Sequence, residues 1–240
     1  MSHLRPSFLT KKSTWNAYDN EDILVQSLVS HVSNLIEKSI QKYSYANIAV
    51  SGGKTPKFFF RALSKVDLDW SKVNISLVDE RFLSPNNSRT NEFLVRENLL
   101  INNAKKANFF PLLQKNSNIC ECCDYLNKNY IKNFKTSFHV IILGMGLDGH
   151  TGSIFPCSRE IRLAIDDNTK KTYIAVYPTS VEYSRITLTK KCILKSKNII
   201  LHISGDQKLQ TLRKAIELGN AEEMPIISCL TRENQIYWCP

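Results

Sequence analysis

The chain has 240 residues, and its 42% hydrophobic, 10% aromatic and 22% charged content supports a large packed core and excludes a disordered protein. Its 32 Lys and Arg residues exceed its 22 Asp and Glu residues, so the net charge of +10 favours anionic partners of any kind. No apolar run is long enough for a signal peptide or a membrane span, and we expect a cytoplasmic protein without membrane contacts.

The predicted elements alternate between helix and strand along the chain. After a polar N-terminal arm at 1–20, apolar residues from Ile23 to Ile40 recur at three- and four-residue steps, which predicts a long amphipathic helix beginning near Asn20. Short apolar runs of strand length follow, separated by segments with helical periodicity, at 47–50, 74–78, 138–143, 173–176 and 198–203.

This alternation predicts parallel βαβ units within one domain spanning 1–240. Runs such as 140–143 and 199–201 are apolar at every position, which is typical of strands covered on both faces. We therefore expect a Rossmann-like α/β fold, with a doubly wound, mostly parallel sheet flanked by helices on both faces. Ligands of such sheets bind beyond the carboxyl ends of the strands, so candidate site residues should follow the strands.

The first predicted strand leads directly into Ser51, Gly52, Gly53, Lys54, Thr55 and Pro56. The two glycines allow backbone amides to approach an anion closely, while Thr55 can cap a helix and Pro56 suits its first turn. A helix N-terminus disfavours nearby lysines unless an anion lies among them. The loop is therefore a candidate phosphate site, with an ordinary Gly-Gly turn as the alternative; its spacing is not that of a Walker loop.

The second predicted strand ends in Asp79, Glu80 and Arg81, and a Pro- and Asn-rich loop then leads to a helix starting near Asn91. Two acids and a base at a strand end form either a surface salt-bridge cluster or part of a binding site.

A cysteine-rich segment follows, in which Cys120 and Cys123 form a C-x-x-C pair on a predicted helix. No second pair at a metal-binding spacing accompanies it. The total of seven cysteines is odd, which does not suit a disulfide framework. We expect free, mostly buried thiols, with metal binding by the C-x-x-C pair as the alternative.

The strand at 138–143 precedes Gly144-Met145-Gly146-Leu147-Asp148-Gly149-His150. The run contains G-x-G-x-x-G, but Asp148 and His150 interrupt it and Pro156 follows closely, so we do not interpret it as a dinucleotide site. Among the five histidines, His150 is the one placed between glycines at a strand end, where an imidazole can accept a proton from water. A loop-stabilising role is the alternative. The remaining histidines, expected to be structural or exposed, are His3, His31, His139 and His202.

Two further basic residues are weaker candidates for contacting an anion. The last predicted strand ends in Ser204-Gly205 and opens a helix carrying Lys208, where the helix dipole favours an anion. Arg185 lies in the segment RITLT at 185–189.

Taken together, the segments VSGGKTP, LVDERFLSPNNSRTNEFLVRENLL, IILGMGLDGHTGSIFP, RITLT, SGDQK and the closing YW resemble the 6-phosphogluconolactonase family in order and spacing. The wider group includes glucosamine-6-phosphate deaminases, which carry a glutamate shortly after the D-G-H. This chain has no acid between His150 and Glu160, which favours the lactonase. It departs from the family's usual serine at Lys54 and alanine at Gly152.

The resemblance implies a hydrolase that opens 6-phosphoglucono-1,5-lactone in the pentose phosphate pathway of carbohydrate metabolism, without cofactor or metal. Hydrolysis of a lactone requires an activated water, hydrogen-bond donors for the developing oxyanion and an anchor for the phosphate. We assign His150 as general base, Asp148 as its polar support and Arg81, with loop amides, to the developing charge. Gly149 is assigned to substrate binding. The phosphate would contact Gly52, Gly53, Lys54, Thr55, Arg185 and Lys208, and the hydroxyl groups would contact Asp79 and Asn91. Glu80 would pair with a base and keep its loop in shape.

Three alternatives compete with this hypothesis. An aldose–ketose isomerase or deaminase would use the same phosphate site but needs a base for C–H abstraction. A sugar-phosphate sensor should carry a DNA-binding helix-turn-helix, for which the residues before the first strand leave little room. A nucleic-acid-binding protein is supported by net charge alone, because the basic residues are scattered. We therefore expect a monomer that binds a sugar phosphate and no nucleic acid.

Overall fold

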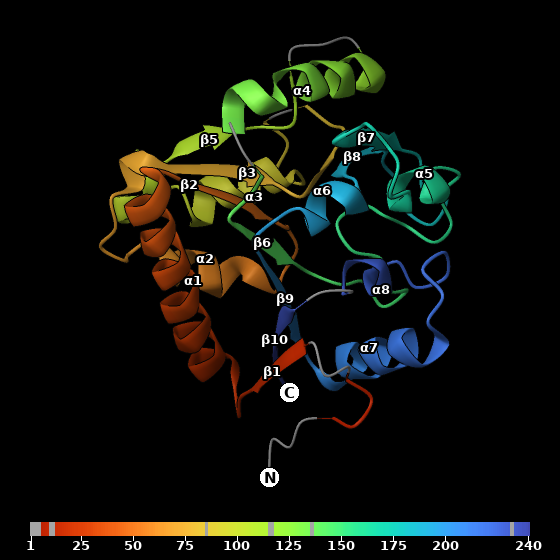
Figure 1. Ribbon diagram of the computed structural model, residues 1–240, viewed down its shortest axis with the longest axis horizontal. Coiled ribbons are helices and arrows are strands. Elements are labelled where there is room, and N and C mark those ends of the chain that lie inside the picture. Colours follow the sequence, from red (N-terminus) through yellow and green to blue (C-terminus); the bar gives the residue numbers. More distant parts are fainter. Residues whose placement is uncertain (1–5, 10–12, 85, 115–117, 135–136, 231–232) are drawn as a thin grey trace.

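A computed structural model describes residues 6–9, 13–84, 86–114, 118–134, 137–230 and 233–240. Its main sheet has seven strands in the order β1-β10-β9-β6-β2-β3-β5, and every neighbouring pair is parallel (Figure 1). The strands span β1 Ser13–Ala17, β2 Ala46–Val50, β3 Val73–Leu77, β5 Asn108–Phe110, β6 Val140–Leu143, β9 Asn198–Ser204 and β10 Asn234–Cys239. All residues of β2 and β6 are buried, so both faces of the sheet are covered there.

Helices flank the sheet, as the sequence predicted. Helix α1 packs on β2, β6 and β10, and α7 packs on β9. The helices span α1 Glu21–Tyr43, α2 Pro56–Leu63, α3 Asn91–Asn98, α4 Ile119–Phe134, α5 Ile161–Ile165, α6 Lys190–Leu194, α7 Asp206–Leu218 and α8 Ile226–Cys229, with short 3-10 helices at Trp70–Lys72 and Asn102–Lys106. The predicted α/β fold with a mostly parallel sheet is confirmed.

Helix α1 shows how the apolar pattern produces this packing. The Asn20 side chain caps its start by accepting a hydrogen bond from the backbone N–H of Ile23 at 3.0 Å. On its apolar face Leu24, Leu28 and Ile36 are fully buried, whereas Ile23 in the first turn is exposed. Within the described ranges no helix has both the length and the apolar character needed to cross a bilayer.

A second, antiparallel sheet of three strands was not predicted. Its order is β4-β8-β7, and its strands span β4 Asp79–Arg81, β7 Tyr173–Val176 and β8 Arg185–Leu188. The run at 173–176 was expected in the parallel sheet, and that expectation is wrong because β7 pairs with β8. A short apolar run identifies a strand without identifying its partner.

The segment interpreted as a polar arm contributes the edge strand β1. Trp15 stacks on Trp238 of β10 with ring centroids 5.7 Å apart, and Tyr18 stacks on Tyr237 at 6.0 Å. These aromatic contacts hold a segment that has no apolar periodicity of its own.

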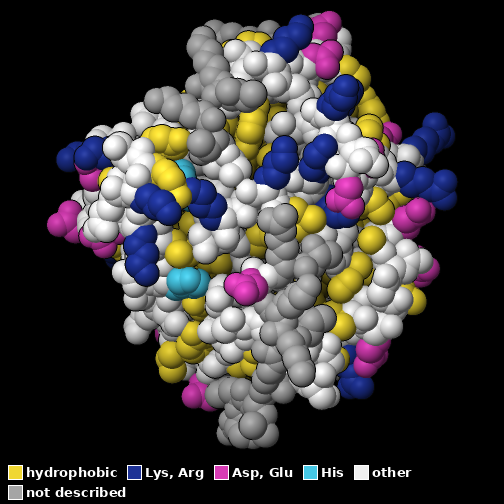
Figure 2. All heavy atoms as spheres, in the orientation of Figure 1, with side chains coloured by type: hydrophobic (Ala, Val, Ile, Leu, Met, Phe, Trp, Pro, Cys, Tyr) yellow, Lys and Arg dark blue, Asp and Glu magenta, His cyan; other side chains and the backbone are white. Residues whose placement is uncertain are grey.

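All seven cysteines are free, and five of them are buried, in agreement with the prediction. Lys and Arg side chains are spread over the face shown in Figure 2, and several lie close together over α6.

Candidate active site

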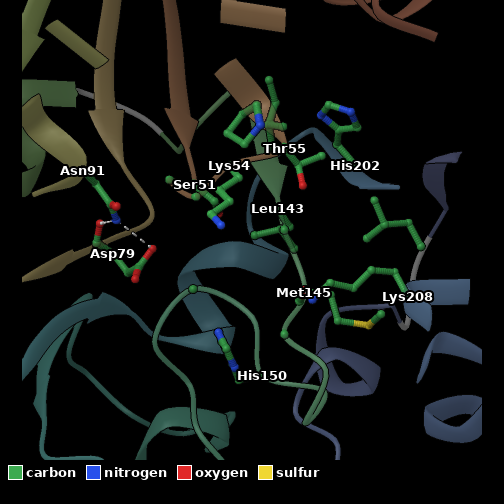
Figure 3. A pocket seen from close by; sticks show the side chains of 18 of the residues that line it. Ser51, Lys54, Thr55, Asp79, Asn91, Leu143, Met145, His150, His202 and Lys208 are labelled. Atoms are coloured by element: carbon green, nitrogen blue, oxygen red, sulfur yellow. Dashed lines mark hydrogen bonds between the residues drawn. The ribbon is translucent and has the colours of Figure 1, made fainter. Parts of the chain in front are cut away.

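A cavity of about 520 Å³ opens beyond the carboxyl ends of β2, β6 and β9. We call it the main cavity. Figure 3 shows Lys54, His150 and Lys208 reaching into it from three separate segments. The lining comprises Ser51, Gly52, Gly53, Lys54, Thr55, Pro56, Asp79, Arg81, Asn91, Ile142, Leu143, Gly144, Met145, Gly146, His150, Gly152, Phe155, Val181, Arg185, His202, Ile203 and Lys208.

The glycine loop after β2 forms one wall, and its glycines are required by geometry. A Cβ on Gly52 would lie 1.9 Å from Asn91 Oδ1, so the loop can pass this side chain only without one. Gly53 adopts a φ of +106°, which L side chains rarely adopt. Pro56 begins α2 as expected, but Thr55 makes no capping hydrogen bond with its side chain, and that expectation is wrong. Its hydroxyl therefore does not compete with an anionic ligand for the N–H groups at the start of α2.

Strand β4 carries the three charged residues that follow β3. The buried Glu80 carboxylate accepts hydrogen bonds at 2.7 Å from the backbone N–H groups of Arg81, Asn91 and Glu92. It holds the start of α3 and forms no ion pair with a basic side chain among the described residues. The expectation that Glu80 pairs with a basic residue is therefore wrong, although the residue does keep its loop in shape. Burial raises the pKa of Glu80 to about 7, despite the opposing effect of these three donors.

The neighbouring carboxylate of Asp79 lies at the cavity wall. Its Oδ2 atom accepts a hydrogen bond from the Ser153 hydroxyl at 2.5 Å, and the Asn91 amide donates to the Asp79 backbone carbonyl at 2.8 Å. The Asn91 Oδ1 atom is buried and has no partner within the described part of the chain. An amide oxygen in this state can accept a hydrogen bond from a ligand hydroxyl.

Two arginines lie opposite each other across the β4–β8 ladder. Arg81 pairs in register with Arg185, and among the described residues neither guanidinium lies within ion-pair distance of a carboxylate. Arg81 donates to the Arg89 carbonyl, and Arg185 donates to the Tyr183 carbonyl at 3.2 Å and lies over the Phe155 ring. Burial lowers the pKa of Arg185. Two adjacent cations without a carboxylate partner favour an anion between them.

The loop after β6 presents an imidazole–carboxylate pair. His150 Nδ1 lies 2.5 Å from Asp148 Oδ1, and the His150 ring packs against Phe155 with centroids 4.3 Å apart. Burial tends to raise the pKa of Asp148, but the hydrogen bond to His150 and its charge outweigh this, so the pKa is lowered. An ionised Asp148 on Nδ1 leaves Nε2 of His150 as the atom able to accept a proton.

Lys208 of α7 connects the other side of the cavity to this loop. Its ammonium donates to the Met145 carbonyl at 2.5 Å. Burial lowers the pKa of Lys208, and the nearby negative charge of Asp148 partly counteracts this. A substrate anion at Lys208 would therefore lie near the same loop that carries His150.

The structure thus brings most of the predicted site residues to one cavity. Two of them do not line it: Asp148 lies beside His150, and Gly149 accepts a hydrogen bond on its carbonyl from the backbone N–H of Ile226 at 2.9 Å. A Cβ on Gly149 would lie 2.8 Å from Met224 Cε, which gives this glycine a packing role.

Sequence reasoning missed several cavity residues. His202 was interpreted as structural, yet it lines the cavity from β9 with both ring nitrogens buried and without partners in the described structure. Burial lowers its pKa to about 4, so the ring is neutral. Its position two residues before Ser204-Gly205 was the one available signal. Phe155, Met145 and Val181 carried no signal, because apolar side chains are expected in any loop near a core.

No group of three or more His, Cys, Asp or Glu side chains suited to a metal ion occurs in the described ranges.

Comparisons with known proteins agree with this geometry. A family model described as glucosamine-6-phosphate isomerases/6-phosphogluconolactonase matches residues 19–238. A 6-phosphogluconolactonase of Rhizobium meliloti is 38% identical over 93% of this chain and 97% of its own length. One of Pseudomonas aeruginosa is 33% identical over 90% of each chain. The crystal structure of a 6-phosphogluconolactonase from Shewanella baltica superposes with a TM-score of 0.92 at 37% identity, covering 96% of this chain and 99% of that one.

Proposed function

Because the chain belongs to the family of glucosamine-6-phosphate isomerases and 6-phosphogluconolactonases, we propose that it hydrolyses 6-phospho-D-glucono-1,5-lactone to 6-phospho-D-gluconate in the oxidative pentose phosphate pathway. The observation that carries the chemistry is the His150–Asp148 pair at the wall of a cavity that also receives four cationic side chains. These cations are Lys54, Arg81, Arg185 and Lys208.

The reaction begins with His150 as general base. Its Nε2 atom takes a proton from a water molecule while the water oxygen bonds to C1 of the lactone, and the carbonyl electrons move onto the carbonyl oxygen. Asp148, ionised and bound to Nδ1, orients the ring and stabilises the imidazolium that forms. When the bond between C1 and the ring oxygen breaks, the proton on Nε2 passes to that oxygen. The product is an open-chain acid, which ionises.

One cationic side chain stabilises the developing oxyanion, and the others bind the substrate phosphate. Arg81 is held by the Arg89 carbonyl, and its buried Nε atom has no partner among the described residues, so it faces the oxygen that becomes negative. The amides of Gly52 and Gly53, together with Lys54, Thr55, Arg185 and Lys208, hold the phosphate. Asp79 and Asn91 contact hydroxyl groups, and Gly149 shapes the loop that carries the base.

The first acid that follows His150 in the chain favours a lactonase over a deaminase or isomerase of the same family. Those reactions need a base placed for C–H abstraction. Glu160, the first acid after His150, uses its carboxylate to accept a hydrogen bond from the Tyr177 backbone N–H at 3.1 Å and is not part of the described lining. Asp79, the carboxylate in that lining, accepts a hydrogen bond from Ser153 on Oδ2 and in this proposal contacts a substrate hydroxyl group, so the turnover assay separates the two reactions at this residue.

The test is acid release from freshly generated 6-phosphogluconolactone in a pH-stat, with the spontaneous opening measured without protein and subtracted. Acceleration that follows the protein concentration supports the proposal. A folded protein that leaves the spontaneous rate unchanged but is stabilised by 6-phosphogluconate would indicate a sensor. Turnover of glucosamine 6-phosphate instead of the lactone would indicate a deaminase.

We also propose that the protein is a cytoplasmic monomer that binds no nucleic acid. Seven free thiols suit a reducing compartment. Light scattering after gel filtration measures the mass, for which a monomer gives 27.5 kDa. Titration with duplex DNA and RNA at physiological salt should give no saturable binding.

A further inference from the structure

A second cavity, of about 470 Å³, shares no lining residue with the main cavity in the described structure. Four lysines line it, Lys170, Lys171, Lys191 and Lys195, above half-buried Tyr130 and buried Cys192. We call it the lysine cavity. Its volume is within the range of small-molecule sites, which are about 300–1,000 Å³.

Hydrogen bonds fix the backbone that carries the lysines. The Asn127 side chain of α4 accepts from the backbone N–H groups of Thr172 and Tyr173 at 2.8 and 2.9 Å. On the other side, the Thr189 hydroxyl donates to the Lys171 carbonyl at 2.9 Å, and Lys191 donates to the Thr169 carbonyl at 2.8 Å. The segment before β7 is thus held between α4 and α6. The part of the cavity wall formed by 169–173 is therefore held in place before a ligand binds.

The positive charge of the lysine cavity has no acidic counterpart among its described lining residues. The closest acid in sequence, Asp167, is paired with Lys190 at 2.8 Å, and neither residue lines the cavity. Burial raises the pKa of Cys192 to about 11, so this thiol is neutral and supplies no negative charge. Four lysines in the wall of one hollow bring like charges near one another, and a bound anion reduces their repulsion.

The two cavities lie at opposite ends of the small sheet. Arg185, at the start of β8, lines the main cavity and pairs with Val176. Leu188, at the end of β8, pairs with Tyr173, which follows directly on Thr172 in the wall of the lysine cavity. An anion in the lysine cavity therefore cannot be a substrate phosphate held by Arg185. Figure 2 shows basic side chains close together over α6, which contributes Lys191 to this wall.

We propose that the lysine cavity is a second binding site, which takes a small polyanion carrying two or more phosphate or carboxylate groups. Lysine ammonium groups act as point charges with rotatable donors, so they accommodate both kinds of group. A single monoanion would neutralise only part of the charge, whereas a polyanion of this size contacts several of the ammonium groups at once. The site is independent of the activity proposed for the main cavity.

Calorimetric titration with inorganic pyrophosphate, without magnesium, tests the proposal. The variant K170Q/K171Q/K195Q removes three exposed ammonium groups from the lysine cavity and spares Lys191, which bonds to the backbone. The matched control, K65Q/K105Q/K106Q, removes the same charge from exposed lysines outside both cavities. A third variant, K54Q/K208Q, weakens anion binding in the main cavity only. Circular dichroism confirms that each variant is folded.

We expect the K170Q/K171Q/K195Q variant to bind pyrophosphate at least tenfold more weakly than the wild type does at the lysine cavity. The K54Q/K208Q variant should retain this binding site. The matched control should bind within twofold of the wild type. The proposal is overturned if the wild type shows no binding at millimolar pyrophosphate, or if K54Q/K208Q abolishes all binding. Equal weakening in the control would also overturn it, since the effect would then reflect net charge alone.

Discussion

Gly146→Ala should inactivate the site without unfolding the protein. A Cβ at this position would lie 2.1 Å from His150 Nδ1 and 2.4 Å from Asp148 Oδ1, whereas ordinary van der Waals contacts of a Cβ begin at 3.4 Å. The imidazole and the carboxylate must therefore both move by about 1 Å, a displacement that can cost about 10²-fold in rate. Gly146 is not among the glycines with positive φ, so alanine fits its backbone conformation. We expect kcat/KM for the lactone to fall about 100-fold while the melting temperature stays within a few degrees.

The assay is the initial rate of acid release in the pH-stat, corrected for spontaneous opening, with thermal unfolding measured on the same samples. Gly144→Ala is the matched control, because a Cβ there meets no atom within 4 Å and the same loop receives the same methyl group. It should keep most of the wild-type activity. Retention of more than about a third of kcat/KM in Gly146→Ala would refute the argument that the position of the His150–Asp148 pair limits the rate, since a 1 Å displacement should cost far more.

Four further predictions follow from the same geometry. His150→Ala should lower kcat by about 10²–10⁴, and a loss below about tenfold would remove the general-base role. In the folded protein, burial raises the pKa of Glu80 from the ordinary 4.5 to about 7. This shift contributes up to about 3 kcal/mol to the free energy of unfolding below pH 4.5, and the contribution is lost as the pH rises through 7. Urea unfolding should show this slope in the wild type and not in Glu80→Gln. For His202 the pH dependence has the opposite sign, because burial lowers its pKa from 6.5 to about 4. Its contribution of up to about 3 kcal/mol to the free energy of unfolding is present above pH 6.5 and is lost as the pH falls through 4. His202→Phe should remove this loss of stability at low pH. Calorimetry should give one transition with equal calorimetric and van't Hoff enthalpies, because one hydrophobic cluster includes residues of both sheets and we propose a single domain.

Local patterns predicted four of the seven strands of the parallel sheet and, in the small sheet, the strand β7 without its partner. The runs at 47–50, 74–78, 138–143 and 198–203 match β2, β3, β6 and β9 to within two residues. A parallel strand that is buried on both faces has a nearly continuous apolar sequence, and this run identifies it. Strand β4, in contrast, consists of Asp79, Glu80 and Arg81, which have low strand propensity and are extended because they pair with β8. That pairing is a tertiary contact with no local signature.

In the candidate site, too, local contacts could be predicted from the sequence and contacts between distant strands could not. Asp148 and His150 are two residues apart, so a loop conformation suffices to join them and the sequence could suggest their partnership. The juxtaposition of Arg81 with Arg185 depends on the register of two strands far apart in the chain, and a shift of one residue would turn one side chain to the other face. The sequence could identify both residues as basic candidates, but the register decides that they lie together.

The distribution of unpaired polar atoms argues that the main cavity is a binding site and not a packing defect. Nine buried side-chain nitrogen and oxygen atoms lack a partner among the described residues, and five of them belong to cavity-lining residues: Ser51, Arg81, Asn91 and, with two atoms, His202. Each such atom costs about 1–3 kcal/mol if nothing satisfies it. Because proteins are only marginally stable, such unsatisfied atoms are tolerated mainly at sites where a ligand or an ordered water provides the missing hydrogen bond. Since donors and acceptors both occur in this set, its partner must offer both, as a hydroxylated sugar phosphate does and an apolar ligand does not.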